Sequence, residues 1–283
     1  MTIGRRIYEA TKRLAGAGCD SPRLDAELLL GHVLGLSRAQ LIARSDSPQA
    51  PDAEQAFQAL VDRRAQREPL AYILGYKEFF GLQLEVTPHV LVPRPETELL
   101  VEQAISLCRE IAPARTVRIA DIGTGSGAIA ISLAASIPTA LVDAVDSSPD
   151  ALAVASRNCR RHGVEARVRL LAGDLLAPLP DPVDVVVANL PYIRQEDIPS
   201  LMPEVRLFEP LGALDGGDDG LELVRRLLQQ VARQPKRPQA VLLEIGADQG
   251  AAVRKMTNEI IPEATVSVTR DYAGLERIVT VRL

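Results

Sequence analysis

Four consecutive residues, Asn189-Leu190-Pro191-Tyr192, give the clearest chemical signal in this chain, and they follow an apolar run at residues 183–188. The run is short and rich in β-branched residues, which predicts a strand buried on both faces of a parallel sheet. Open α/β sheets bind ligands beyond the carboxyl ends of such strands. The Asn189 side-chain oxygen and the Leu190 carbonyl can each accept a hydrogen bond from an NH₂ group. Pro191 fixes φ, and Tyr192 offers a flat face. The four residues are therefore candidates for orienting a planar nitrogen, with a simple Asx-turn as the alternative.

A glycine-rich loop upstream predicts a nucleotide-type binding site. Residues 117–122 predict a strand and residues 128–135 an apolar helix, and the loop between them is Gly123-Thr124-Gly125-Ser126-Gly127. Glycines let a backbone turn tightly and approach a ligand closely. The following helix N-terminus presents free N–H groups. These five residues are therefore expected to bind part of a cofactor.

Acidic residues follow the next two expected strands. Asp146 comes directly after the strand expected at 140–145, and its carboxylate can accept hydrogen bonds from two neighbouring ribose hydroxyls. Asp174 follows the strand expected at 168–172, where an acid can bond an adenine amino group. Leu175, beside it, is expected at the same site. Together with the glycine loop and Asn189, these residues form the expected cofactor-binding set.

The glycine loop alone leaves two cofactors open, because Gly123, Gly125 and Ala128 also satisfy the G-x-G-x-x-G/A pattern of NAD enzymes. S-adenosyl-L-methionine is favoured by Asp121, which gives the D-x-G-x-G form common in methyltransferases, and by Asp174. It is also favoured by the Asn-Leu-Pro-Tyr sequence, which is similar to the motif of methyltransferases that act on amide or exocyclic amino nitrogens. The sequence therefore resembles an S-adenosylmethionine-dependent methyltransferase.

Composition fits a soluble globular protein with an ample core, since the chain has 283 residues, 47% of them hydrophobic and 24% charged. No apolar stretch approaches the roughly 20 residues that span a bilayer, and a signal peptide is not expected. The three cysteines are scattered, which predicts inert thiols in a reducing cytoplasm. The three histidines lack ligand spacing, so no metal site is expected. The arginines of residues 157–169 could form a basic patch, but a solvated surface is the simpler interpretation.

The chain is expected to fold as a small helical domain followed by an α/β domain. Residues 1–73 lack strand alternation and predict short helices, with Ser37 as an N-cap and a further helix over 51–66. Residues 74–93 are expected to form a linker with a β-hairpin, whose strands would be 79–86 and 90–92. Residues 94–283 alternate strand and helix, which predicts a doubly wound, Rossmann-like, seven-stranded and mostly parallel sheet. Its last three strands are expected at 240–245, 264–269 and 276–282.

Further motifs, in the same order along the chain, resemble the HemK/PrmC family of peptide chain release factor glutamine N5-methyltransferases. They are EPLAYILG at 68–75, EFFGL at 78–82, LVPRPETE at 91–98 and VRLFEP at 205–210. With the glycine loop and Asn-Leu-Pro-Tyr, the resemblance covers nearly the whole chain. One departure is that the family usually has Asn-Pro-Pro-Tyr, whereas Leu190 stands here in place of the first proline. The role expected at that position is hydrogen-bond acceptance by the backbone carbonyl, which leucine retains.

The resemblance implies methyl transfer from S-adenosyl-L-methionine to the glutamine side-chain amide in the Gly-Gly-Gln motif of release factors. It assigns Asn189, Leu190, Pro191 and Tyr192 to substrate binding and catalysis. The PRPETE segment would help to close the cofactor pocket, and the helical domain would grip the release factor. The protein is expected to be a cytoplasmic monomer that binds neither membrane nor nucleic acid. The alternative is an amino methyltransferase of nucleic acid, acting on adenine N6 or guanine N2.

Overall fold

The computed structural model describes residues 1–48 and 52–283, which divide into two compact units. Unit 1 comprises Met1–Tyr76 and Met202–Phe208, and unit 2 comprises Lys77–Leu201 and Glu209–Leu283. The domain boundaries drawn from the sequence, at residues 73 and 93, stay a prediction. Sequence patterns gave no sign that the short segment Met202–Phe208 would join the N-terminal helices.

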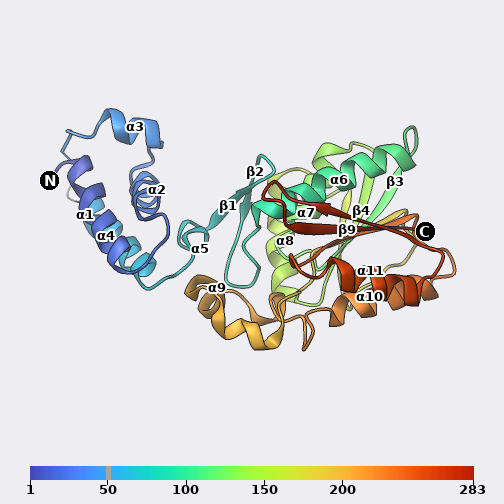
Figure 1. Ribbon diagram of the computed structural model, residues 1–283. Helices are drawn as coiled ribbons and strands as arrows, with labels where there is room; N and C mark the ends of the chain where they lie inside the picture. The colour runs from blue at the N-terminus through green and yellow to red at the C-terminus, as the bar shows by residue number, and fades with distance from the viewer. Residues whose placement is uncertain (49–51) are drawn as a thin grey trace. The chain divides into compact units, whose positions relative to one another are not determined.

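Unit 1 is helical in the part of the chain that the structure describes (Figure 1). Its helices are α1 (Ile3–Gly16), α2 (Pro22–Leu34), α3 (Arg38–Ala43), α4 (Asp52–Ala65), α5 (Leu70–Leu74) and α9 (Pro203–Phe208). Their apolar faces enclose one core, in which Leu14, Leu29 and Phe57 have no exposed surface. The expected N-cap at Ser37 is confirmed, because Ser37 and Gln40 form a reciprocal capping box at the start of α3. Pro51, where the helix expected over 51–66 would begin, lies outside the described residues.

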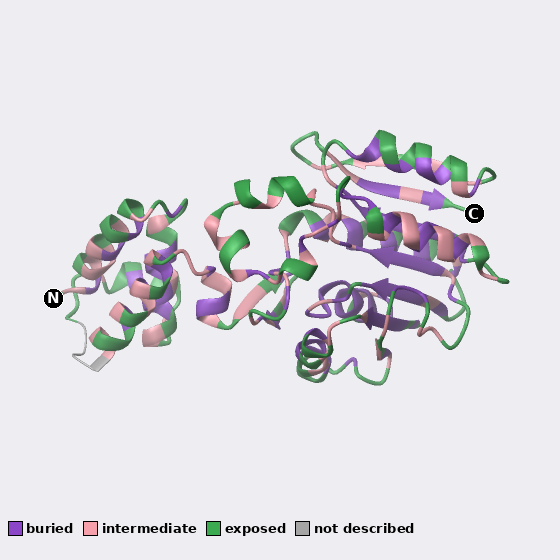
Figure 2. Ribbon diagram, turned by 90° about the horizontal axis from the view of Figure 1, so that it is seen from below, coloured by how far each residue is buried: buried purple, intermediate pink, exposed green. Residues whose placement is uncertain are grey.

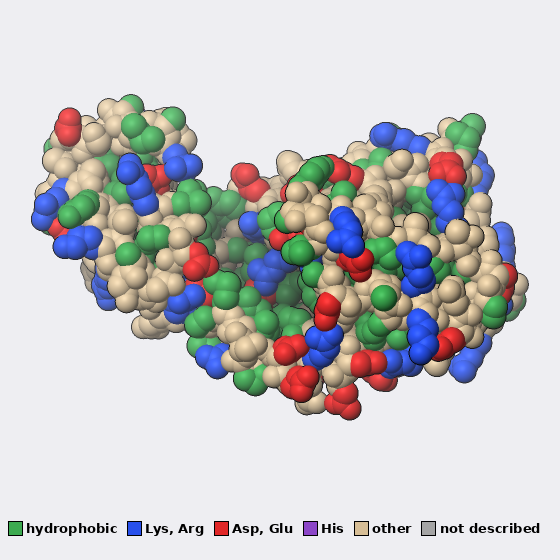
Figure 3. Space-filling model, in the orientation of Figure 1, with side chains coloured by type: hydrophobic (Ala, Val, Ile, Leu, Met, Phe, Trp, Pro, Cys, Tyr) green, Lys and Arg blue, Asp and Glu red, His purple; other side chains and the backbone are tan. Residues whose placement is uncertain are grey.

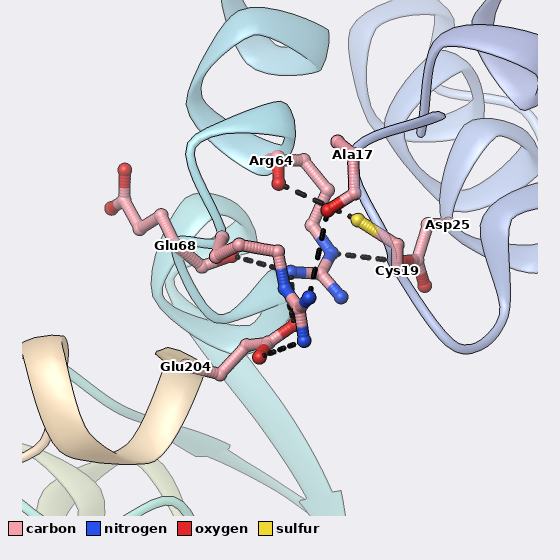
Figure 4. Close-up of polar contacts among 7 residues, drawn as sticks. Ala17, Cys19, Asp25, Arg64, Glu68 and Glu204 are labelled. Carbon is pink, nitrogen blue, oxygen red and sulfur yellow. Dashed lines mark hydrogen bonds and ion pairs between the residues drawn. The ribbon is translucent and has the colours of Figure 1, made fainter. Parts of the chain in front are cut away.

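A buried cluster of charges holds α9 within unit 1 (Figure 4). The Arg64 Nε donates to Asp25 Oδ2 at 2.7 Å, and the Arg64 Nη1 donates to Glu204 Oε1 at 2.9 Å. Arg67 donates to both oxygens of Glu204, at 2.6 and 2.5 Å. Burial by itself would raise the pKa of Glu204, but the hydrogen bonds from the two arginines outweigh it and lower that pKa. The cluster therefore keeps Glu204 ionised inside the helical unit.

A two-stranded hairpin of β1 (Tyr76–Phe79) and β2 (Leu82–Glu85) begins at the end of unit 1. Its position corrects the expectation, because the turn lies at Phe80-Gly81 and not at residues 87–89. Phe80 and Gly81 both have positive φ, 51° and 74°, as a type I′ hairpin turn requires. Residues 90–92 form no strand. The Val92 amide instead donates to the Glu209 carboxylate at 3.4 Å.

Unit 2 is built on the expected seven-stranded sheet, whose strand order is β5-β4-β3-β6-β7-β9-β8. The strands are β3 (Val117–Ile122), β4 (Ala140–Asp146), β5 (Val168–Ala172), β6 (Val185–Ala188), β7 (Ala240–Glu244), β8 (Thr265–Arg270) and β9 (Glu276–Arg282). The first five pair in parallel, and β9 is antiparallel to both β7 and β8. The mostly parallel Rossmann-like arrangement is thus confirmed. The strand expected at 183–188 is shorter than predicted, because it begins at Val185.

Helices cover both faces of this sheet (Figure 1). They are α6 (Pro95–Ile111), α7 (Ala128–Ser136), α8 (Pro149–Arg161), α10 (Glu222–Arg233) and α11 (Gly250–Ile260), with short 3₁₀ turns η1 (Gln195–Ser200) and η2 (Leu211–Ala213). Residues of α6, α7 and α8 join one buried cluster, and residues of α10 and α11 join another. Strand β6 contributes Val185 and Val187 to the first cluster and Val186 and Ala188 to the second. It is therefore buried on both faces, as expected, and the central strands of the sheet are the most buried part of unit 2 (Figure 2).

The remaining sequence expectations concern cysteines, charges and membrane spans. Cys19, Cys108 and Cys159 are free and buried, and burial raises the pKa of the Cys108 thiol to about 12. Basic and acidic side chains are interspersed over the surface of unit 2 that Figure 3 shows. Of the arginines considered as a basic patch, Arg157 pairs with Glu85 and Arg169 pairs with Asp143. Among residues 1–48 and 52–283, no helix is long and apolar enough to cross a membrane.

Candidate active site

The carboxyl ends of four neighbouring parallel strands of unit 2 surround a cavity of about 380 Å³. Most of the residues expected to bind cofactor or substrate line it, namely Gly123, Thr124, Gly125, Ser126, Asp146, Asp174, Leu175, Asn189, Leu190 and Pro191. Gly127 and Tyr192 are absent from this lining. The segment 89–97 contributes Pro93, Arg94 and Thr97 to the same cavity. The strand order thus brings together segments that are widely separated in the sequence.

The glycine loop turns sharply between β3 and α7, with φ of 76°, 54° and 83° at Gly123, Gly125 and Gly127. These are left-handed conformations that favour glycine. A Cβ added at Gly125 would meet no atom within 4 Å, although Gly125 lines the cavity. The backbone of Gly125 is therefore exposed directly to the cavity, so a ligand could approach it closely. A Cβ at Gly127 would instead clash with Ile131, so that glycine serves the packing of the loop against α7.

Asp121, near the end of β3, holds the glycine loop in place through hydrogen bonds. It is completely buried, and its Oδ2 accepts hydrogen bonds from the Thr124 hydroxyl at 2.6 Å and from the Ala130 amide at 3.1 Å. Burial raises the pKa of Asp121 to about 7, and these hydrogen bonds only partly oppose that rise. The neighbouring charge of Asp146 raises it further. Asp121 thus ties the start of the loop to the first turn of α7.

Asp146 lies at the carboxyl end of β4, and its carboxylate is oriented by the backbone. Its Oδ2 accepts from the Gly125 amide at 2.8 Å, and its Oδ1 accepts from the Ser148 amide at 2.9 Å. Each carboxylate oxygen has more than one lone pair, so further donors can still bind. Asp146 also lines the cavity, and the two amide bonds fix which way its carboxylate faces.

Asp174 and Leu175 follow β5 at the other side of the cavity. Asp174 Oδ2 pairs with Arg226 of α10 at 2.6 Å, while half of the Asp174 side chain stays exposed. Leu175 has a positive φ of 50°, which a leucine adopts only when its surroundings impose it. Its side chain is buried in the same cluster as Leu176. The backbone at this strand end is therefore held in an unusual conformation beside the cavity.

The motif expected to bind the acceptor begins where β6 ends. Asn189 lines the cavity, and its Nδ2 donates to the Thr97 hydroxyl at 3.1 Å. Leu190 is only 4% exposed, and its side chain packs within the cluster that includes Ile122. The Leu190 carbonyl belongs to the backbone and remains independent of that packing. Asn189 is thus fixed by α6, and the loop after it is anchored in the core.

Tyr192 does not line the cavity and is half-buried beside charged groups. Its carbonyl accepts a hydrogen bond from Gln249 Nε2 at 2.9 Å. Burial raises the pKa of the Tyr192 phenol to about 12, and the nearby charge of Glu244 adds to the rise. The phenol therefore stays protonated at neutral pH. The expected packing of Tyr192 against an acceptor plane stays a prediction.

Four residues at the site were not singled out as site residues in the sequence analysis. Thr97 and Arg94 belong to the PRPETE segment, and Glu209 belongs to the VRLFEP segment, so the family motifs were their only signal. Glu209 accepts from Arg94 Nη2 at 2.6 Å, which ties these two segments together. Glu244, the last residue of β7, lies within the strand expected at 240–245 and was not singled out there. It is 2% exposed and lies beside Thr97 and Asn189.

No ion site competes with this interpretation in the part of the chain that is described, since residues 1–48 and 52–283 contain no group of three His, Cys, Asp or Glu side chains that could hold a metal ion. Taken together, the cavity lining combines a glycine loop, two carboxylates at strand ends and an asparagine amide held by Thr97. Such an arrangement can bind a nucleoside-like cofactor and hold a planar nitrogen beside it.

Comparison with known proteins agrees with this geometry. Residues 7–75 match the family model of the PrmC N-terminal domain, and residues 97–205 match that of the methyltransferase small domain. The release factor glutamine methyltransferase of Moorella thermoacetica is 46% identical over 278 residues, which are 98% of this chain and 97% of the relative.

Solved structures with low sequence identity share the fold. The catalytic domain of hMettl16, solved with a MAT2A 3′UTR hairpin, aligns with a TM-score of 0.58 and 18% identity, over 78% of this chain and 81% of that chain. The N-terminal domain of human METTL16, solved with SAH, aligns with a TM-score of 0.50 and 18% identity, over 72% and 76% of the two chains. Fold and site together define a Rossmann-like methyltransferase. The chain belongs to the release factor glutamine methyltransferase family.

Proposed function

We propose that the protein transfers a methyl group from S-adenosyl-L-methionine to the side-chain amide nitrogen of the glutamine in the Gly-Gly-Gln motif of peptide chain release factors. Membership of the family over nearly the whole chain supports the reaction. The observation that carries the assignment to this site is the Asn189 amide, which lines the same cavity as the glycine loop and is held by Thr97.

The chain's own residues fit the cofactor. Gly125 leaves open space where a side chain would otherwise stand, and Asp146 has an oriented carboxylate for the ribose hydroxyls. Asp174 and Leu175 would bind the adenine side of the cofactor. When bound, S-adenosyl-L-methionine supplies an electrophilic methyl group. The related fold of human METTL16 was solved with SAH, which supports this choice over NAD.

The acceptor glutamine needs orientation, because the lone pair of an amide nitrogen is delocalised into its carbonyl. Asn189 Oδ1 and the Leu190 carbonyl would accept the two N–H groups of that amide. Pro191 stiffens the loop, and Tyr192 would exclude water. Holding reactants within about 3–3.5 Å in a productive orientation can supply several kcal/mol without a strong base. No nucleophilic cysteine or histidine is required.

We further propose that the N-terminal helices grip the release factor away from its glutamine, since a Gly-Gly-Gln loop offers little contact area. The protein would act as a cytoplasmic monomer without binding nucleic acid. The three buried free thiols suit a reducing compartment. On the face that Figure 3 shows, basic and acidic side chains are interspersed, whereas duplex binding favours a continuous basic face.

The test is to incubate the full chain with methyl-labelled S-adenosyl-L-methionine and either a release factor bearing Gly-Gly-Gln or unmodified DNA and ribosomal RNA. Mass spectrometry should locate one added methyl group on the glutamine. A release factor with alanine in place of that glutamine is the control and should stay unlabelled. Methylation of nucleic acid with the glutamine untouched would overturn the proposal and favour the amino methyltransferase of nucleic acid.

A further inference from the structure

Gln249 is a buried amide that lies between β7 and α11, close to the site but outside it. Its side chain is part of a residue that is only 3% exposed, and it is absent from the cavity lining. A buried amide is costly unless its oxygen and its NH₂ group are hydrogen-bonded. The partners of Gln249 therefore show which parts of the fold this residue joins.

The Gln249 side chain joins segments that are far apart in the sequence. Its Oε1 accepts from the Gly246 amide at 2.8 Å, which closes the local turn before α11. Its Nε2 donates to the Tyr192 carbonyl at 2.9 Å, and the Gly220 carbonyl lies 3.4 Å from the same nitrogen. A reversed amide would set its oxygen against two carbonyls and its NH₂ group against an N–H donor. The surroundings thus select the orientation in which Gln249 donates to the acceptor motif.

Two glycines bring a third segment against the same part of the motif. Gly220 has a φ of 71°, and a Cβ built there would overlap the Tyr192 carbonyl oxygen and lie 2.7 Å from Gln249 Nε2. A Cβ built at Gly216 would lie 2.8 Å from the Pro191 carbonyl oxygen. Glycine is needed at both positions, because the backbone of the motif takes the space that a side chain would fill.

The acceptor motif is therefore fixed at both ends. At its start, the Asn189 side chain donates a hydrogen bond to α6 at 3.1 Å. At its end, Gln249 holds the Tyr192 carbonyl. Pro191 restricts φ between these two points. They determine the direction of the Leu190 carbonyl, which in the proposed function accepts one N–H of the acceptor amide.

We propose that Gln249 is a positioning residue for methyl transfer, which holds the backbone after Pro191 so that the Leu190 carbonyl faces the acceptor nitrogen. The proposal rests on the proposed function, because it explains how that site orients its acceptor. Gln249 acts through the Tyr192 carbonyl and does not touch the cavity. A displacement of about 1 Å at a reacting group can lower a rate about a hundredfold. The loss should therefore appear in kcat and not in cofactor binding.

The experiment compares Gln249→Met and Gln249→Glu in the full-length protein. Methionine has a side chain of similar length but cannot donate to the Tyr192 carbonyl. With a Gly-Gly-Gln release factor, Gln249→Met should lower kcat on the order of tenfold to a hundredfold. KM, and S-adenosyl-L-methionine affinity measured by calorimetry, should change much less. Gln239→Met is the matched control, because Gln239 is exposed at the amino end of β7 and its replacement should leave kcat unchanged.

The pH profile of Gln249→Glu tests the donated hydrogen bond directly. Its carboxyl group can accept from the Gly246 amide, but it can donate to the Tyr192 carbonyl only while it is protonated. Relative to the wild type at each pH, Gln249→Glu should therefore retain more kcat than Gln249→Met at about pH 6, and lose that advantage toward about pH 9. A side chain that only fills space would produce no such dependence.

A second readout does not depend on activity. The Ile193 amide donates to the Leu214 carbonyl at 3.1 Å, and the Gly216 amide donates to the Ile193 carbonyl at 2.8 Å. Both amides lie next to the point that Gln249 holds, so they should exchange with solvent faster in Gln249→Met than in the wild type. Exchange of the β6 amides should be unchanged. If the wild type fails to methylate glutamine, the proposed function fails while this comparison still tests Gln249.

Gly220→Ala disturbs the Tyr192 carbonyl from its other side. The control is Gly163→Ala, since Gly163 has a similar φ of 64° and an added Cβ there would meet no atom within 4 Å. Both substitutions introduce the strain of a positive φ, but only Gly220→Ala displaces the motif. Its kcat should therefore fall well below that of Gly163→Ala.

Several outcomes would overturn the role of Gln249. They are a folded Gln249→Met protein with wild-type kcat, equal kcat for Gln249→Met and Gln249→Glu at every pH, and unchanged exchange of the Ile193 and Gly216 amides in Gln249→Met. If Gln249→Met does not fold, the glycine pair decides, and equal kcat for Gly220→Ala and Gly163→Ala would then overturn the proposal.

Discussion

Arg67 and Glu204 lie 137 residues apart in the sequence, yet they form a two-point ion pair inside unit 1, with contacts of 2.6 and 2.5 Å. Glu204 belongs to α9, which follows the acceptor motif in the chain. The chain therefore leaves unit 2 after Leu201, contributes α9 to the helical unit, and returns at Glu209. Glu209 in turn binds Arg94 of the PRPETE segment. The Asn-Leu-Pro-Tyr motif of unit 2 is thus followed in the chain by a segment that belongs to unit 1.

Replacing Glu204 with glutamine should destabilise unit 1. Arg64 has a side chain that is 8% exposed, and the substitution removes one of its two carboxylate partners. Breaking a buried pair by removing one partner costs on the order of 3 kcal/mol. Urea unfolding of the full chain measures the change. The control is Glu222→Gln, since the Glu222–Arg225 pair is exposed and should matter by less than about 1 kcal/mol. Equal effects of the two substitutions would contradict a structural role for Glu204.

Asn189→Ala should abolish methyl transfer to glutamine while cofactor affinity falls much less. Orientation of the acceptor counts in the transition state and contributes little to binding the nucleotide. Asn189→Asp keeps an acceptor oxygen but loses the Nδ2 that donates to Thr97, and it places a second carboxylate beside Glu244. We therefore expect only weak activity from it. Single-turnover rates and calorimetry on the same samples separate the two effects, and a parallel loss of cofactor binding would count against this assignment.

Leu190→Ala should separate the backbone role of this position from its packing role. The side chain is buried, so truncation should lower the free energy of unfolding by about 2–3 kcal/mol. The carbonyl that would bind the acceptor is unchanged, so turnover below the unfolding temperature should stay near that of the wild type. Thermal unfolding and methylation assays check both parts. A stable protein with strongly reduced turnover would show that the leucine side chain itself contacts the acceptor.

Asp146→Ala should weaken binding of S-adenosyl-L-methionine by about a hundredfold, because two ribose hydroxyls lose a shared charged acceptor. The substitution also frees the Gly125 and Ser148 amides that now donate to Asp146. Calorimetry gives the affinity directly. Asp150→Ala is the control, since Asp150 is largely exposed and lies outside the cavity lining. Tight binding of NAD, with none of S-adenosyl-L-methionine, would contradict the cofactor assignment altogether.

Glu244 should make stability depend on pH in a particular direction. Burial raises the pKa of Glu244 from its ordinary value of 4.5 to about 7, so the fold favours the neutral acid. Its stabilising contribution is fully present below pH 4.5 and is lost as pH rises through about 7. Glu244→Gln cannot ionise, so the pH-dependent loss is confined to the wild type. The free energy of unfolding of Glu244→Gln should therefore rise relative to that of the wild type as pH increases from 4.5 to about 7. Asp121 titrates in both proteins and cancels in the comparison.

The measurement is urea unfolding of wild type and Glu244→Gln at a series of pH values. A difference between the two proteins that stays constant from pH 4.5 to 8 would show that Glu244 is not held in a neutral form. Glu204 should act in the opposite sense, because its pKa is lowered and its contribution is lost as pH falls.

Local sequence patterns predicted much of the secondary structure of unit 2. The run at 117–122 and the glycines after it have patterns that specify strand, turn and helix through short-range chemistry. The same holds for Asp146 and Asn189, whose places follow from the ends of recognisable strands. Ser37 capped its helix as expected because capping depends on residues only three positions apart.

Tertiary structure decided the contacts that couple distant segments. The hairpin turn lies at Phe80-Gly81, where phenylalanine has a positive φ that it seldom adopts and its amide donates to Glu98 Oε1 at 2.8 Å. The apolar pattern at 90–92 had instead suggested a strand. No local pattern could distinguish Glu204 or Glu244 from exposed acids, since a carboxylate is recognised as buried only by what packs around it. Arg64 and Arg67 contact Glu204, and Thr97 contacts Asn189, because the fold packs together segments that are distant in sequence. The sequence by itself determined the strand ends and their chemistry, and the fold decided how the key amide is held, because hydrogen-bond partners are set by three-dimensional proximity.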